Sequence, residues 1–473
     1  MSGGTQDSIN TEKVTYLLGL LGRQRSVSEL NPDLSDSDFE DIASEEDELH
    51  KDSDKKVYTM LSQMLTKPPV VEDSYESSTT DSQSAVEDVI TGIYTDLIEM
   101  SESNLVRNDP FNLKVHVKYA EKCLTSPFPP QYVGYDANHG WMLYWLVNFL
   151  RTMNRPVDES VSKLVTDKIL RVTINEGLGG IGGGSGQIGH AASMYASVLA
   201  LVLVEDFDTL NRIRHNLYKW MMSLKKDNGS FSMHPGGESD TRSTYCILVI
   251  ASLLNILDEQ LCKDTASWLA TCQTYEGGFS GIPNTEAHGG YTFCAIASYF
   301  VLLGKGEGSF KERLNNVIDV DNLLRWTAMR QYHLEGGFSG RTNKLVDACY
   351  SFWIGGIFPL LEMSQNTNGS LFDRDALRTY ILNCCQDSRG GLRDKPGKSP
   401  DFYHSNYTTL GLSIAEHEYS FMAQTKPANN DDYAYLVDSV RVRDGDCSAI
   451  NPIFGLPLGV AEKCKEYFKL ADK

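Results

Sequence analysis

A glycine-rich turn recurs about every fifty residues over most of the chain. The five copies are GGIGG at 179, NGSFS at 228, GGFSG at 277, GGFSG at 336 and GGLRD at 390. Their apolar residues follow one another at intervals of 50, 48, 59 and 54 residues: Ile181, Phe231, Phe279, Phe338 and Leu392. A repeat of this length is typical of stacked supersecondary units that bury their core between neighbours.

Each turn is followed by a long apolar run, such as YCILVIASLLNIL or YTFCAIASYFVLL, and the last four are preceded by an amphipathic segment such as LNRIRHNLYKWMMSLKK. A helix that is apolar on every side must be buried, whereas an amphipathic helix can cover it. We therefore predict an all-α fold, a closed α/α barrel with an inner and an outer ring, with an open solenoid as the alternative. A sixth hairpin around residues 114–123 and 140–154 would close the ring. Glycine in each turn allows the positive φ of a tight entry into the inner helix.

Ionisable side chains recur where the inner helices begin. Counting nine residues past the apolar turn residue reaches His190, Asp240, His288 and Asp347, and His404 lies at plus twelve in the fifth repeat. All five are expected at one rim of the barrel. For any single position the alternative is an N-cap, a role that Asp fills better than His.

Two of these positions, together with a nearby cysteine, offer potential metal ligands. Asp347 and Cys349 are two residues apart, and His404 opens the next inner helix. A carboxylate, a thiolate and an imidazole can hold Zn²⁺ with a fourth position open. The alternative is a capping aspartate beside a buried cysteine, because D-x-C by itself is common.

Cations and aromatic side chains also gather in these segments. The basic residues in the turns are Arg242, His288, Arg341, Lys344, Arg393, Lys395 and Lys398. They favour an anion at the helix N-termini, although solvated lysines are the alternative for some of them. The aromatic residues of the inner helices are Trp141, Trp145, Tyr195, Tyr245, Tyr291, Tyr350, Trp353 and Tyr403. These patterns predict an apolar interior with an anion site and a soft-metal site at one mouth. Such a combination suits an enzyme that joins a long hydrophobic diphosphate to a thiol.

Charge and composition argue against several other classes of protein. The chain has 473 residues and a formal net charge of −20, which argues against binding nucleic acid or an anionic membrane. No apolar stretch approaches about 18 residues, so we expect no direct membrane insertion. The ten cysteines have no repeated spacing and the start lacks a signal peptide, which favours a reducing, cytoplasmic location.

The N-terminal part of the chain differs in composition from the rest. Residues 28–54 contain twelve acidic residues and one lysine. Low apolar content with high net charge cannot offset the chain entropy lost on folding. We therefore predict a disordered acidic, Ser-rich tail over residues 1–85 and a barrel domain over residues 86–473.

Several blocks resemble one known family. These are GYDANHGWMLYW, DTRSTYC, AHGGYTFC, EGGFSGRTNKLVDACYSFW and RDKPGKSPDFYHSNY. Over about residues 90–465 the chain is similar to the β subunits of protein farnesyltransferases. The resemblance implies a barrel of six hairpins, one catalytic Zn²⁺, Mg²⁺ with the diphosphate, and an obligate heterodimer with a helical-repeat α subunit. It also implies transfer of a farnesyl group from farnesyl diphosphate to the cysteine of a C-terminal C-a-a-X motif in proteins such as small GTPases.

The resemblance implies roles for individual residues. The zinc ligands of the family match Asp347, Cys349 and His404. Its diphosphate clamp matches His288, Arg341, Lys344 and Tyr350, and its isoprenoid wall matches Arg242, Tyr245, Cys294 and Trp353. Its peptide pocket matches Trp141, Trp145 and Tyr403. Lys344, Tyr350 and Asp394 are the residues expected to act on the reacting groups.

Specificity within the family depends on few positions. Bulky Trp141 and Tyr403 resemble the farnesyl-type enzymes, whereas type I geranylgeranyltransferases have smaller side chains there. Asp394 resembles the magnesium-binding carboxylate, for which type I relatives have lysine. A type I β subunit is the nearest alternative and a non-enzymatic barrel scaffold a distant one. A terpene cyclase is disfavoured because D-x-D-D and D-C-T-A-E are absent from the sequence.

Overall fold

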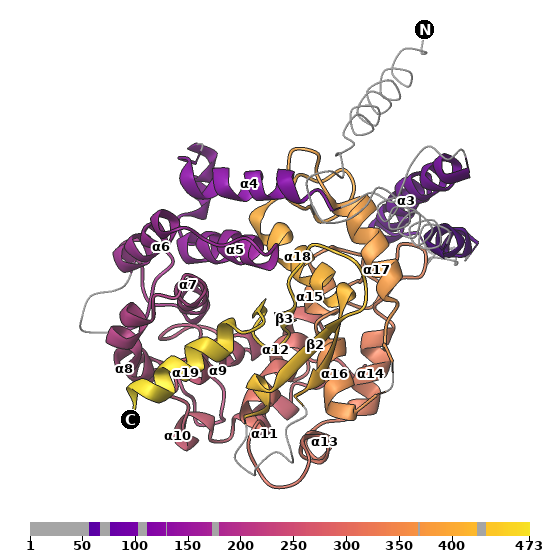
Figure 1. The fold of residues 1–473 in the computed structure, drawn as a ribbon. Helices are drawn as coiled ribbons and strands as arrows, with labels where there is room; N and C mark the ends of the chain where they lie inside the picture. The colour runs from indigo at the N-terminus through magenta and orange to yellow at the C-terminus, as the bar shows by residue number, and fades with distance from the viewer. Residues whose placement is uncertain are drawn as a thin grey trace, which may run out of the picture. The chain divides into compact units, whose positions relative to one another are not determined.

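Six helical hairpins, each made of an outer and an inner part, build the barrel (Figure 1). The computed structural model describes residues 56–66, 76–102, 111–128, 130–172, 179–367, 369–422 and 432–473. The inner helices are α5 (His139–Thr152), α7 (Ala191–Leu203), α9 (Thr241–Leu253), α12 (Gly289–Leu302), α15 (Tyr350–Trp353) with α16 (Ile357–Gln365), and α18 (Phe402–Glu416).

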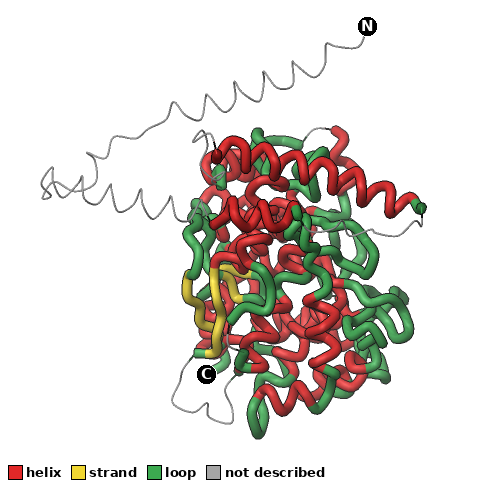
Figure 2. The backbone as a smooth tube through the Cα atoms, turned by 90° about the vertical axis from the view of Figure 1, so that its right-hand side faces the viewer, coloured by secondary structure: helices red, strands yellow, loops and turns green. Residues whose placement is uncertain are grey.

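The outer layer consists of the helices that precede each inner helix along the chain. They are α4 (Leu113–Thr125), α6 (Glu159–Val172), α8 (Phe207–Ser223), α10 (Glu259–Cys262) with α11 (Thr265–Ala270), α13 (Phe310–Asn315) with α14 (Val320–Ala328), and α17 (Arg374–Tyr380) with the π-helical turn η3 (Ile381–Cys385). A 3₁₀ turn, η2 (Pro130–Tyr135), leads into α5. In the side view, helices account for most of the described chain (Figure 2).

The inner ring is closed. Each inner helix packs against the next one along the chain, and the last, α18, packs against both α15 and the first, α5. The predicted α/α barrel is therefore confirmed and the open solenoid is wrong. The hairpin of α4 and α5 is the predicted sixth unit. Helices of bilayer-spanning length and hydropathy do not occur within the described ranges.

The burial of the two layers follows their sequence patterns. In α7 and α9 nearly every side chain is buried, including small polar ones such as Ser197 and Ser252. In α8 only one face is buried, with Leu210, Leu217 and Met221 directed into the protein. An apolar run thus gives an inner helix and an amphipathic one an outer helix, as the hydrophobic effect requires.

The glycine turns lie before the inner helices, and the apolar residue of all five is fully buried. The glycine two positions before it has positive φ in each repeat, for example +108° at Gly277 and +81° at Gly336. A Cβ on Gly277 would lie 2.1 Å from the carbonyl oxygen of Asn322, so side chains are excluded by space as well as by φ. The predicted role of the turn glycines is confirmed.

The fourth inner helix differs from its prediction as one continuous apolar run. It breaks after α15 and resumes as α16, with Gly355 and Gly356 at the break. The amide of Gly355 donates to the carbonyl of Tyr350, five residues back, at 3.1 Å. Two adjacent glycines favour helix poorly, and Pro359 has no amide to offer the Gly355 carbonyl. The break follows from these residues.

The folded chain begins earlier than we predicted. Residues 1–55 and 67–75 of the predicted tail lie outside the described residues. Residues 56–65 form a helix in which Leu61 and Met64 are buried, and α3 (Ser78–Glu102) begins before residue 85. The hydroxyl of Tyr94 on α3 donates to the carbonyl of Glu335 in the fourth turn at 2.7 Å. Gln83, within the predicted tail, also donates from Nε2 to Glu335 Oε1 at 3.1 Å, so the described part of this region packs on the barrel.

The C-terminal segment closes the end of the barrel opposite the glycine turns. Two antiparallel pairs form there, β1 (His417–Phe421) with β2 (Val437–Arg441) and β3 (Ile450–Asn451) with β4 (Leu456–Pro457), together with η4 (Tyr433–Tyr435). The carbonyl of Gly455 accepts from Asn148 Nδ2 on α5 at 2.9 Å, and that of Ile453 accepts from the Tyr245 hydroxyl on α9 at 2.8 Å. Helix α19 (Val460–Ala471) then packs against α7, α8 and α9.

The crossing of α15 and α18 depends on Gly411, where an added Cβ would lie 2.2 Å from the Cβ of Ser351. We expect Gly411→Ala to force these helices apart and to lower the free energy of unfolding by about 1–3 kcal/mol. Chemical denaturation measures this change. Gly92→Ala on α3 is the control, because no heavy atom lies within 4 Å of its new Cβ. Equal stability of Gly411→Ala and the parent protein would contradict the close helix approach.

A buried carboxyl makes stability depend on pH. Burial raises the pKa of Glu335 to about 8, and although Gln83 Nε2 donates to its Oε1 at 3.1 Å, its Oε2 has no hydrogen-bond partner within the described chain. Because this pKa lies above the ordinary value of about 4.3, the folded state binds more protons than the unfolded state between these two pH values. Stability should therefore fall as pH rises towards 8.

Glu335→Gln removes this titration, so its melting temperature should fall less than that of the parent protein between pH 6 and pH 9. Thermal unfolding across this range tests the expectation, with Glu121→Gln on the exposed face of α4 as the control. Parallel pH profiles of Glu335→Gln and the parent protein would show that the carboxyl is not held neutral.

Candidate functional site

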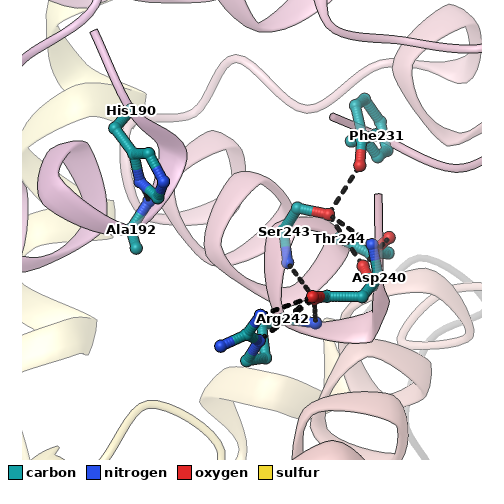
Figure 3. A network of polar contacts seen from close by, with 7 residues as sticks. All are labelled: His190, Ala192, Phe231, Asp240, Arg242, Ser243 and Thr244. Atoms are coloured by element: carbon teal, nitrogen blue, oxygen red, sulfur yellow. Dashed lines mark hydrogen bonds and ion pairs between the residues drawn. The ribbon is translucent and has the colours of Figure 1, made fainter. Parts of the chain in front are cut away.

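Side chains at the N-termini of the inner helices include the ionisable residues singled out by spacing. His190 Nδ1 accepts from the amide of Ala192 at 3.2 Å, and His288 Nδ1 accepts from the amide of Gly290 at 3.0 Å. Asp240 caps α9 (Figure 3). All three residues therefore cap their helices, and in His190 and His288 a neutral imidazole nitrogen takes the place of a hydroxyl or carboxylate. Capping also fixes the orientation of each ring.

The second repeat shows how a capping residue positions a cation. Asp240 accepts from Arg242 Nη2 at 2.6 Å and from its Nε at 3.1 Å, while Ser243 completes a capping box (Figure 3). The Ser243 hydroxyl also donates to the carbonyl of Phe231 in the turn at 2.6 Å. The guanidinium of Arg242 lies over the ring of Tyr291, 5.4 Å from its centroid. About half of the Arg242 side chain remains exposed. Asp240 therefore holds the guanidinium in place while part of it stays open to the mouth of the barrel.

Asp347, Cys349 and His404 converge where α15 and α18 begin. One ligand atom of each lies within 4.8 Å of the others. His404 Nε2 is 3.2 Å from Asp347 Oδ1, and Asp347 Oδ1 accepts from the amide of Cys349 at 2.9 Å. On its other side, His404 Nδ1 lies 2.7 Å from Asp401 Oδ2, the carboxylate that caps α18. Asp401 thereby directs Nε2 towards the cluster.

The charges of this cluster suit a cation. His404 Nε2 is buried and lies 3.2 Å from Asp347 Oδ1, so the imidazole faces a carboxylate at contact distance. Burial disfavours the charged imidazole, but the carboxylates of Asp347 and Asp401 outweigh it and raise the pKa of His404 to about 10. Burial and the Asp347 carboxylate raise the pKa of the Cys349 thiol. An oxygen, a sulfur and a nitrogen donor at this separation fit Zn²⁺.

A cationic loop lies between the fourth turn and this cluster. Arg341 Nη1 donates to Glu286 Oε2 at 3.1 Å, and the carbonyl of Gly340 accepts from the amide of Gly289 at 2.9 Å. The ring of Tyr350 lies directly against Gly340, where a Cβ would come within 1.9 Å of its Cζ. Lys344 is exposed, and within the described chain no hydrogen bond or ion pair engages its ammonium group.

His288 and Tyr350 form a polar pair beside this loop. His288 Nε2 is 3.0 Å from the Tyr350 hydroxyl. Because Nδ1 accepts from a backbone amide, we assign the proton to Nε2, which then donates to the Tyr350 oxygen. Burial, assisted by the positive charge of Arg341, lowers the pKa of His288 to about 4, so the ring is neutral near pH 7. The hydroxyl proton of Tyr350 remains available to an incoming acceptor.

Asp394 lies in the fifth turn, next to the cluster of Asp347, Cys349 and His404. Its carbonyl accepts from the amide of Ala348, between Asp347 and Cys349, at 2.9 Å. Its carboxylate is paired with Lys395, which is nearly buried. Burial and the Asp347 carboxylate raise the pKa of Asp394. This carboxylate has the charge and position to bind a second cation, provided that Lys395 releases it.

Aromatic side chains form a closed circuit inside the ring, with at least one from each inner helix. Neighbouring ring centroids are 5.3–5.8 Å apart, and the pair on α15 and α18 is joined by a 2.9 Å hydrogen bond. In order the members are Trp141, Trp145, Tyr403, Trp353, Phe293, Tyr245 and Tyr195. Cys294, next to Phe293 on α12, is also buried. The circuit gives the barrel an apolar, aromatic interior.

Not every predicted cation faces the mouth. Arg393 donates through Nε to the carbonyl of Cys384 in η3 at 3.1 Å, and Lys398 is exposed, so the structural and the solvated alternatives apply to these two. Our sequence reasoning missed Asp401, although its position three residues before His404 is the spacing of an N-cap. It also missed Glu286 and Phe293, which carry no local signal.

Comparison with known proteins identifies the family of this fold. The family described as the prenyltransferase alpha-alpha toroid domain matches residues 111–455. The chain is 39% identical to protein farnesyltransferase subunit beta of Saccharomyces cerevisiae, covering 95% of this chain and 94% of the relative. It is 37% identical to the subunit of that name from Schizosaccharomyces pombe, covering 78% and 97%. With geranylgeranyl transferase type-1 subunit beta of Arabidopsis thaliana the identity is also 37%, but it covers only 48% of this chain and 60% of the relative.

A solved structure supports the fold. The chain superposes on Candida albicans protein geranylgeranyltransferase-I complexed with GGPP with a TM-score of 0.59 and 19% identity, covering 76% of this chain and 99% of that one. At this identity, the structural likeness shows only that the two chains share the toroid fold. The long matches to farnesyltransferase β subunits decide the family, and the chain belongs to the β subunits of the protein farnesyltransferases, a family of prenyltransferases.

Proposed function

We propose that this chain transfers a farnesyl group from farnesyl diphosphate to the thiol of a C-terminal C-a-a-X cysteine, as the catalytic β subunit of a heterodimer with an α subunit. The observation that carries the proposal is the convergence of Asp347, Cys349 and His404 within 4.8 Å, next to a loop of cations. A nucleophile and a leaving anion could be held side by side there. The location in the cell is proposed to be cytoplasmic.

Asp347, Cys349 and His404 would hold Zn²⁺. When bound, zinc lowers the pKa of a coordinated thiol and so supplies a thiolate at neutral pH. Asp401 orients His404 through Nδ1, and the backbone amide of Cys349 fixes the Asp347 carboxylate. The chain thus holds its donors in place before any substrate arrives.

The leaving diphosphate would be stabilised by Lys344, Arg341, His288 and Tyr350. Negative charge grows on it as the bond to carbon 1 of the isoprenoid breaks, so fixed cations and donors lower the barrier. Lys344 supplies a charge without a competing partner, and the neutral His288 directs the Tyr350 proton away from itself. Asp394 would hold Mg²⁺, which neutralises diphosphate charge when bound. Lys395, paired with Asp394 in this structure, would then act on the anion or move aside.

The aromatic circuit would receive the isoprenoid and the end of the peptide. Arg242, Tyr245, Cys294 and Trp353 form the proposed isoprenoid wall, and Trp141, Trp145 and Tyr403 the proposed peptide pocket. Trp141 contacts Trp145 and Tyr195 at centroid distances of 5.3 and 5.8 Å, so its indole fills the interior. This filling supports a fifteen-carbon substrate over the twenty-carbon one of a type I enzyme. The carboxylate of Asp394 supports the same choice.

Cys349→Ala tests the metal assignment. We expect loss of zinc and a fall in kcat of more than about a hundredfold, because even weaker perturbations of zinc sites cost ten- to a hundredfold. Zinc content and prenyl transfer are measured on the complex with the α subunit. Cys272→Ala, which removes another buried thiol, should keep both zinc and turnover. A fully active Cys349→Ala enzyme would refute the proposed metal site.

Trp141→Thr tests the length of the cavity. Removing the indole should open space for one more isoprene unit, so the ratio of kcat/KM for the twenty-carbon over the fifteen-carbon diphosphate should rise about tenfold or more. Competition of the two diphosphates for one C-a-a-X peptide measures the ratio. Trp141→Phe, which keeps a ring in place, should shift it less. An unchanged ratio in Trp141→Thr would mean that other residues limit chain length.

A further inference from the structure

The loop that carries Arg341 and Lys344 is anchored by side chains from outside it. The Thr342 hydroxyl donates to Glu276 Oε1 of the preceding glycine turn at 2.7 Å. The Tyr332 hydroxyl donates to the backbone carbonyl of Lys344, also at 2.7 Å. Between these two anchors Asn343 has a φ of +57°, a conformation that needs support from its surroundings. The loop is thus anchored through the side chain of Thr342 and through the backbone of Lys344.

Tyr332 is itself rigidly held. It is nearly buried, its amide donates to the carbonyl of Gly337 at 3.0 Å, and its own carbonyl accepts from the amide of Gly336 at 2.7 Å. Burial raises the pKa of its hydroxyl, so the group is a hydrogen-bond donor throughout the neutral range. Without this donor, the part-buried carbonyl of Lys344 would have to turn towards water or another partner, and the loop backbone would move with it.

The backbone and the side chain of Lys344 have different surroundings. The carbonyl is fixed by Tyr332, whereas the exposed ammonium group has no hydrogen bond or ion pair to any described residue. A fixed backbone limits the positions that the long side chain can reach. An ammonium group without a partner can turn towards an anion without first breaking an ion pair.

We propose that Tyr332 is a positioning residue for Lys344: its hydroxyl holds the loop so that the ammonium group meets the leaving diphosphate. This proposal rests on the function proposed above, because it assumes that Lys344 acts on that anion. Tyr332 touches neither substrate nor metal in this role. Its contribution comes from the pre-organisation of a charge that would otherwise be spread over several loop conformations.

Tyr332→Phe deletes the hydroxyl and keeps the ring. We expect the single-turnover rate of farnesyl transfer to fall about tenfold, since small misplacements of a reacting group cost one to two powers of ten. Zinc content and the KM for the C-a-a-X peptide should not change, because neither depends on the loop. A lower affinity for inorganic pyrophosphate, measured as a competitive inhibitor of farnesyl diphosphate, should accompany the slower rate.

Tyr299→Phe is the matched control. Its hydroxyl also donates to a backbone carbonyl, that of Ala266, at 3.0 Å, and its ring is fully buried, but it lies on the outer side of α12 against α11. This variant should lose a similar amount of stability without a change in rate or in pyrophosphate affinity. If both variants slow the reaction equally, the effect of Tyr332 is merely structural and the proposal fails.

A double-mutant cycle with Lys344→Ala separates the possible failures. If Tyr332 acts through Lys344, Tyr332→Phe should cause no further loss in the Lys344→Ala enzyme. Additive losses would overturn the positioning role. If Lys344→Ala slows the reaction and Tyr332→Phe does not, only the positioning role is wrong. An unchanged rate in Lys344→Ala would refute both the proposed leaving-group stabilisation and the role of Tyr332 in it.

Discussion

The packing of α18 against α15 and α5 is the contact on which the rest of the molecule depends. It closes the ring, and it brings the start of α18 beside the start of α15. Asp347 and His404 are 57 residues apart in the chain, yet their side chains come within 3.2 Å. In an open solenoid each repeat would contact only its neighbours in sequence, so α18 could not pack against α5, and the aromatic circuit would have no closure. The small residues at the α15–α18 crossing permit this contact.

Carboxylates hold the charged side chains at the mouth of the barrel in place. Asp240 holds Arg242, Glu286 holds Arg341, and Asp401 holds His404. Each pair restrains a charged group near the start of an inner helix or on the loop that leads to it. The buried Asp240 and the mostly buried His404 lie where electrostatic interactions are stronger than in water. Lys344 differs because only its backbone is anchored. The mouth thus combines charged groups held by carboxylates with the exposed ammonium group of Lys344, whose backbone is anchored and whose charge is open to an anion.

Much of this arrangement could be predicted from local patterns. The repeat interval, the apolar runs and the glycines required hairpins with buried inner helices, and the residues at plus nine mark the helix starts. D-x-C followed by a histidine at the next helix start indicated the metal cluster. Asp401 was within reach of the same reasoning, because an N-cap three residues before His404 is a local signal. The folded chain begins before the predicted residue 86, since Leu61 and Met64 are buried and Gln83 on α3 donates to Glu335 of the fourth turn.

Contacts between distant segments had no such signal. The β3–β4 turn reaches α5 and α9 from the C-terminal end of the chain, and Tyr332 reaches Lys344 across a turn. The sequence by itself determined which helices are buried, where they begin and which chemical groups stand at their starts, because these depend on hydrophobic periodicity and on turn residues that act over a few positions. Only the tertiary structure decided that the ring closes, which carboxylate holds which cation, and which hydroxyl fixes the loop. Those outcomes depend on how separate surfaces fit together, and complementarity of that kind is not encoded in any single stretch of residues.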